Sequence, residues 1–131
     1  MFKILDKVAA SMKLEWKQEE MLRIDRAYYR GDVDCPVVAV EHENGYKGIW
    51  ESEIPKLLAV NAGLRVLICY PPEKEHYILQ KRIKGKLNAE MRDGRFDDEF
   101  LLILGKNEVC PREKKSFNIY WYYPGVYRKK L

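Results

Sequence analysis

The sequence has few of the residues that build disulfide frameworks or zinc sites, with three cysteines and two histidines in 131 residues. Cys35, Cys69 and Cys110 are widely spaced and form no Cys-x-x-Cys pair, which argues against both kinds of site. Cys69 stands within the apolar segment LRVLICY, where a cysteine is typically a small buried side chain. Unpaired cysteines suit a reducing setting, so we expect a cytoplasmic protein.

Long apolar runs are also missing, and none approaches the ~20 residues that a membrane-spanning helix needs. The first residues mix Lys3, Asp6 and Lys7 into the apolar positions, which is unlike a signal peptide. Hydrophobic residues make up 47% and charged residues 34% of the chain, a balance typical of globular proteins. We therefore expect one globular domain over residues 1–131, with no membrane association.

Positive charge is unevenly distributed, although the net charge is only +4. Residues 74–95 hold seven basic and three acidic side chains, and residues 112–131 hold six basic and one acidic. The rest of the chain is therefore acidic. This separation suits a protein that holds a polyanion beside a carboxylate cluster, whereas solvated helix faces and a charged tail are the simpler interpretation.

Apolar spacing predicts an α/β fold with a mixed central β-sheet flanked by helices. Residues 21–29 and 37–44 form a predicted hairpin, and later strands that alternate with helices predict parallel pairs. Ser52 is the predicted N-cap of the middle helix, and Gly85 lies inside the last one. The predicted helices cover 2–20, 53–61 and 73–91, and the remaining predicted strands cover 64–70, 100–104 and 117–123.

Three acidic residues are the candidates for chemistry. Glu41 and Glu43 are two apart on one predicted strand and therefore share a face, and a hairpin partner would bring Asp25 beside them. Converging carboxylates form an oxygen-rich site of the kind that Mg²⁺ or Mn²⁺ prefers. Acids that simply end a strand in solvent, with Asp25 paired to Arg23 or Arg26, would give the same pattern.

The segment Ile24-Asp25, followed by an apolar strand ending VAVEHEN, resembles the core of the PD-(D/E)XK, or restriction-endonuclease-like, nucleases. The order of predicted elements over roughly residues 1–105 is similar to that family. The resemblance implies hydrolysis of nucleic acid, DNA rather than RNA, with one or two Mg²⁺ or Mn²⁺ ions. It assigns Asp25 and Glu41 as metal ligands and catalytic acids.

Glu43 stands where the family usually has lysine, and the resemblance implies that it acts as a further metal ligand or as the base. Lys56 on the following helix is the candidate to replace that lysine. Members often place an acid from the first helix near the metal, which would be Glu15 or Glu19. Loss of the lysine is equally compatible with a protein that binds nucleic acid without cleaving it, or with an interaction subunit of a larger complex.

Basic and aromatic residues supply the expected nucleic-acid surface. Side chains that contact phosphates position nucleic acid without reading its sequence. The aromatic residues of 117–127 could stack on unpaired bases, but those up to Tyr123 are more typical of a core strand. So small a chain is expected to act as a homodimer, with a partner subunit, or on structured substrates. The candidate phosphate-binding residues are Lys81, Arg82, Lys84, Lys86, Arg92 and Arg95.

Overall fold

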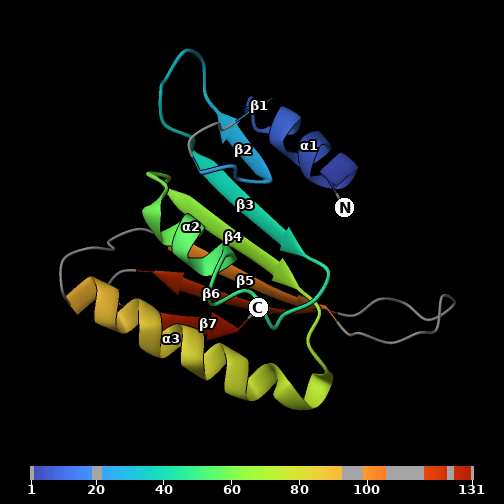
Figure 1. Ribbon diagram of the computed structural model, residues 1–131. Coiled ribbons are helices and arrows are strands. Elements are labelled where there is room, and N and C mark those ends of the chain that lie inside the picture. Colours follow the sequence, from blue (N-terminus) through green and yellow to red (C-terminus); the bar gives the residue numbers. More distant parts are fainter. Residues whose placement is uncertain (1, 19–21, 93–98, 106–116, 124–125, 131) are drawn as a thin grey trace, which may run out of the picture.

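The computed structural model describes residues 2–18, 22–92, 99–105, 117–123 and 126–130 (Figure 1). At residues 91, 92, 123 and 126–130 it describes the backbone alone. The first element is a helix at the N-terminal end. After it, strands alternate with two further helices and a one-turn 3-10 segment, η1. The elements are α1 (Phe2–Ser11), β1 (Glu15–Lys17), β2 (Arg26–Tyr29), β3 (Val38–Glu43), α2 (Glu53–Ala59), β4 (Leu64–Cys69), η1 (Glu73–Glu75), α3 (His76–Arg92), β5 (Glu99–Gly105), β6 (Phe117–Tyr123) and β7 (Val126–Lys130).

The described strands form a single seven-stranded mixed sheet whose spatial order follows the chain, β1 to β7. β3, β4 and β5 are parallel to one another, and every other neighbouring pair is antiparallel. Parallel neighbours need a crossover connection, and α2 and α3 provide the two that this sheet contains. The prediction of an α/β protein with a mixed sheet is confirmed.

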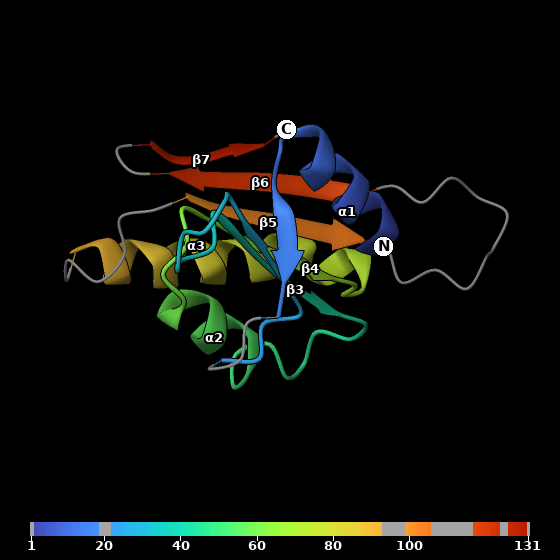
Figure 2. The same ribbon diagram turned by 90° about the horizontal axis from the view of Figure 1, so that it is seen from above.

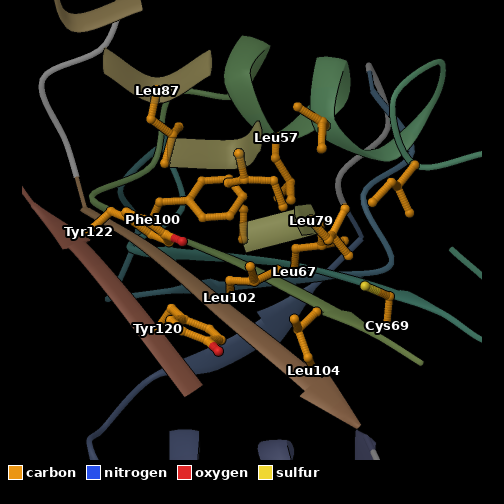
Figure 3. Packing of buried hydrophobic residues seen from close by; sticks show 14 of the residues in the cluster. Leu57, Leu67, Cys69, Leu79, Leu87, Phe100, Leu102, Leu104, Tyr120 and Tyr122 are labelled. Carbon is orange, nitrogen blue, oxygen red and sulfur yellow. The ribbon is translucent and has the colours of Figure 1, made fainter. Parts of the chain in front are cut away.

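Helices cover both faces of the sheet. α2 and α3 lie against one face and α1 against the other, as the view from above shows (Figure 2). The larger core fills the space beneath α2 and α3, where leucines of β4 and β5 meet aromatic rings of β5 and β6 (Figure 3). Residues of α3 one turn apart, Leu79, Ile83 and Leu87, point into this core as predicted. Cys69 is also fully buried there, as expected.

The first helix is shorter than predicted. It ends at Ser11, and Lys13 has a positive φ of 58°, which turns the chain out of the helix. The residues that follow form β1, where Trp16 stands opposite Tyr28 on β2. Helical spacing continues through this segment in the sequence, but pairing with an available sheet edge decides its conformation.

The strand predicted for residues 21–29 begins only at Arg26. Arg23 has a φ of 54°, in the left-handed region that interrupts an extended strand. Asp25 therefore lies just before β2 and not within it. The predicted hairpin itself is confirmed, since β2 and β3 are antiparallel with Arg26 opposite Val40.

A buried arginine fixes the C-terminal end of α2. Arg65 is 4% exposed, and its guanidinium donates hydrogen bonds of 2.6–2.7 Å to the carbonyl oxygens of Leu57, Val60 and Ala62. The last carbonyls of a helix have no partners within it, so this side chain supplies them. Ser52 precedes α2 as predicted, but its side chain makes no capping hydrogen bond. None of the helices in the described ranges is long and apolar enough to cross a membrane.

Candidate functional site

The predicted acidic residues meet where β3 ends. Because β2 and β3 pair as a hairpin, Asp25 comes to lie beside Glu41. The backbone N–H of Asp25 donates to Oε1 of Glu41 at 3.3 Å, and the backbone N–H of His42 donates to Oδ2 of Asp25 at 2.9 Å. The backbone beside each carboxylate thus holds the other carboxylate, and the hairpin fixes their relative positions.

A lysine from α2 completes this arrangement. Nζ of Lys56 lies 3.1 Å from Oε1 of Glu41, and the side chain of Glu41 is only 2% exposed. Glu41 points toward α2 because alternate residues of a strand share a face, and α2 packs on that face. The Lys56 side chain is 26% exposed, so it contacts solvent as well as Glu41. The structure therefore joins Asp25, Glu41 and Lys56.

The ionisation of Glu41 is strongly perturbed. The pKa of Glu41 is raised to about 7, mainly by burial away from water and next by the nearby negative charge of Asp25. The hydrogen bond and positive charge of Lys56 oppose this rise but do not cancel it. Two adjacent carboxylates with only one partly exposed lysine between them form a site that gains from additional positive charge.

Glu43 lies on the same strand face, two residues beyond Glu41. Its Oε1 accepts a hydrogen bond of 3.2 Å from the backbone N–H of Gly45, in the turn after β3. His42 points to the opposite face, as expected of a packing residue. Its Nε2 lies 3.0 Å from the hydroxyl of Tyr70, its ring contacts Phe2 edge-on, and burial lowers its pKa.

The residues at this site fit a magnesium-type ion only in part. Within the described ranges, no group of three or more His, Cys, Asp or Glu side chains is arranged to hold a metal. Asp25 and Glu41 still supply two hard carboxylate groups. Mg²⁺ is commonly bound by one or two carboxylates, with water and substrate phosphates as its other ligands. The mutual repulsion of these two acids is the feature that such an ion would relieve.

Glu53 is a buried acid that inspection of the sequence did not single out. It lies one turn before Lys56 on α2, it is 9% exposed, and its Oε2 has no hydrogen-bond partner in the described structure. The pKa of the Cys69 thiol is raised to about 12, mainly by burial and to a smaller extent by the negative charges of Glu43 and Glu53. The only signal in the sequence was the place of Glu53 in the first turn of a predicted helix, which is also where acids favour the helix dipole.

The basic side chains of α3 differ in exposure and in their partners. Lys81 and Arg82 are exposed and Lys84 is half-buried. Exposed Lys86 lies 3.2 Å from Glu90 one turn on, which partly neutralises it. At 3.6 residues per turn these four side chains span roughly 200° of the helix, and their role in phosphate binding stays a prediction. Arg95 and the side chain of Arg92 lie outside the described residues.

Other candidates lie away from the site. Tyr120 and Tyr122 of β6 are buried in the core, as the core-strand interpretation predicted (Figure 3), while the side chains of 123–130 lie outside the described residues. Trp121 donates to Glu99 at 2.9 Å. Glu15 is in β1 opposite Tyr29, at the far end of the hairpin, so its expected place on the first helix near the metal is wrong. Glu19 is not among the described residues.

The chemistry of this site is thus defined by a carboxylate pair, a lysine and a neighbouring buried acid, gathered by one hairpin and one helix. Such a set can bind a cation, position a water molecule or hold a proton near neutral pH. Comparisons of the chain with protein-family models, with curated proteins and with solved structures found no match.

Proposed function

We propose that this protein is a divalent-metal-dependent nuclease of the PD-(D/E)XK type, with a restriction-endonuclease-like core, that hydrolyses phosphodiester bonds in nucleic acid, DNA rather than RNA. The observation that carries the proposal is the contact of 3.1 Å between Lys56 and Glu41, beside Asp25. The lysine missing from the motif position, where Glu43 stands, is replaced from α2. The acids match those of the family motif, but the lysine beside them comes from α2 and not from β3.

Asp25 and Glu41 would hold Mg²⁺ or Mn²⁺, which when bound polarises a phosphate and lowers the pKa of a water molecule. The buried carboxylate of Glu41 is positioned by the Asp25 amide and by Lys56, so its orientation is set before substrate arrives. Lys56 is partly exposed, and its ammonium group can also donate to a phosphate oxygen. Glu43 is half-buried beside the site and would accept the proton of the attacking water.

Cleavage of labelled single-stranded and duplex oligonucleotides tests this proposal. We expect wild-type protein to cleave with Mg²⁺ or Mn²⁺ and not with EDTA. Asp25→Asn and Lys56→Met should each reduce the rate roughly 100-fold or more, because each removes charge from the reacting centre. Asp34→Asn is the matched control, since Asp34 is also an exposed aspartate but lies in the turn between β2 and β3. Equal rates for Asp25→Asn and Asp34→Asn would refute the assignment.

Metal binding distinguishes a nuclease from a protein that binds nucleic acid without cleaving it. Calorimetric titration of Mn²⁺ into wild type and into an Asp25→Asn/Glu41→Gln double variant should show binding that only the wild type retains. The Lys56–Glu41 ion pair also favours a second function, a module that binds nucleic acid without cleaving it, because the lysine compensates the buried acid in part without a metal. Nucleic-acid binding without Mn²⁺ binding or cleavage would support that module. Neither binding nor cleavage would leave an interaction subunit, acting with a partner.

A further inference from the structure

Two neighbouring hollows lie between Glu43, beside the candidate site, and the first turns of α3. One hollow of about 380 Å³ is lined by Glu43, Tyr70 and the turn after β3, and one of about 330 Å³ is lined by Trp50, Ile78 and Arg82. Tyr46 and Lys47 line both hollows, so the two adjoin each other. We name this surface the Tyr46 groove. The segment between β3 and α2 (Figure 1) contributes Tyr46, Lys47 and Trp50 to its lining.

Aromatic rings in the groove are held in fixed positions. Trp50 is half-buried and packs against the main core, while the guanidinium of Arg82 lies 4.0 Å from its ring centroid. The hydroxyl of Tyr46 donates a hydrogen bond to Glu75, which raises the pKa of the hydroxyl, and the Glu75 carboxylate also lines the groove. A ring that is already ordered loses little entropy when a ligand stacks on it.

The wall of the groove formed by α3 is also anchored. His76 begins the helix and is 3% exposed; its Nε2 lies 3.0 Å from the carbonyl oxygen of Pro71, and its Nδ1 lies 2.9 Å from Nδ2 of Asn118 on β6. The next two residues, in contrast, are large and exposed, with Tyr77 at 61% and Ile78 at 67%. Exposed apolar side chains beside a hollow are typical of a binding surface.

We propose that the Tyr46 groove binds an unpaired nucleotide of the substrate, with its base against the Tyr46 ring and the part of Trp50 that Arg82 does not cover, and its phosphates near Lys47 and Arg82. Together with the proposed nuclease function, on which its role in cleavage rests, this makes the substrate single-stranded nucleic acid or a duplex with unpaired bases. The argument is one of shape and charge. Bases in a duplex are stacked on each other, so only an unpaired base can offer its face to a protein ring.

The groove is lined by two cations, Lys47 and Arg82, and by two carboxylates, Glu43 and Glu75, so a strand would place its phosphates on the side of the cations. Arg82 retains guanidinium N–H donors at its edges while it lies over Trp50, so it can bind phosphate in that position. Lys81 precedes Arg82 on the same turn, with Nζ 4.5 Å from the centroid of the exposed Tyr77 ring. This pair offers a second ring and a second cation beyond the groove. Alternation of rings and cations is the pattern by which proteins hold single strands.

Binding measured without metal tests the proposal independently of cleavage. In EDTA, fluorescence anisotropy would compare a labelled oligo(dT) with a labelled hairpin duplex. We expect the wild type to bind the single strand about 10-fold or more tightly than the duplex, and Trp50→Leu to lose about 10-fold for the single strand only. Trp50→Phe keeps a ring and should retain most of the affinity. Circular dichroism and thermal unfolding of both variants confirm that they fold.

Two further readouts locate the bound strand. Oligo(dT) should quench the tryptophan fluorescence of wild type, and the quenching should disappear in Trp50→Phe although binding persists. Arg82→Gln should weaken single-strand binding, whereas the matched variant Arg30→Gln should not. Arg30 is equally exposed, but it follows β2 at the opposite end of the strands from Glu43.

Several outcomes would overturn the groove assignment. Equal affinity for single strand and duplex, no binding of either, or unchanged single-strand binding in a folded Trp50→Leu variant would each do so; the second would point to a protein partner instead. If cleavage depends on Asp25 but not on Trp50, the nuclease function stands and the groove assignment fails. If Trp50 governs single-strand binding but no metal-dependent cleavage occurs, the groove stands and the nuclease function fails.

Discussion

Replacing Glu41 by glutamine is expected to stabilise the folded protein at neutral and alkaline pH, although the change removes an ion pair. Burial, with Asp25 beside it, raises the pKa of Glu41 from 4.5 to about 7 despite Lys56. An acid whose pKa is higher in the folded state favours folding fully below its unfolded pKa, and this contribution is lost as the pH rises through the folded pKa. The wild type therefore loses stability between about pH 4.5 and 7 at this residue, and glutamine does not.

The size of the effect follows from the two pKa values. A difference of one in pKa corresponds to about 1.4 kcal/mol, so the change from 4.5 to about 7 gives roughly 3 kcal/mol as an upper bound. Lys56 is partly exposed and can be hydrated once Glu41 is neutral, which keeps the cost of the unpaired lysine small. With a typical urea dependence of ~1–3 kcal/mol per molar, the midpoint in Glu41→Gln should rise at pH 8, by at most about 1–3 M.

Urea unfolding followed by circular dichroism, in EDTA and at several values between about pH 4 and pH 8, measures this difference. The other titrating groups are common to both proteins, so the difference in unfolding free energy isolates Glu41. Glu51→Gln is the control, because Glu51 is exposed just before α2 and should show no such trend. A difference that does not change with pH, or a Glu41→Gln protein that is less stable at pH 8, would mean that Lys56 and the Asp25 amide stabilise the carboxylate overall.

Three further substitutions test other contacts. Lys56→Met should raise the pKa of Glu41 above about 7, because Lys56 is what lowers it; carbon-detected NMR titration would measure this, and an unchanged pKa would refute the contact. Arg65→Met should lower the unfolding free energy by roughly 3 kcal/mol or more, because three carbonyls at the end of α2 lose their donor; a loss below ~1 kcal/mol would contradict this. Gly105→Ala should cost about 1–3 kcal/mol in the same urea assay, since a Cβ there meets the Tyr70 ring, and a neutral effect would show that the ring moves freely.

Most elements of the fold could be predicted from local pattern. The run Val37–Val40, the apolar segment around Cys69 and the helical spacing of Leu79, Ile83 and Leu87 each predict the element that the structure contains. These segments are long or strongly periodic, so local preference and burial agree. Pattern was misleading at the N-terminal end, where pairing with β2 converts residues after Ser11 into a strand, and β1 and β7 were not predicted. Edge strands depend on a partner that the local sequence does not specify.

The candidate site divides in the same way. The sequence by itself determined which acids share a face, because alternation along a strand places Glu41 and Glu43 together whatever the rest of the chain does. Only the tertiary structure decided that Lys56 contacts Glu41, that Glu53 is buried without a partner for one oxygen, and that Trp50 lies under Arg82. Each of these depends on how helices pack across the sheet from distant parts of the chain. Burial, and with it the raised pKa of Glu41, is a property of that packing and not of any local run of residues.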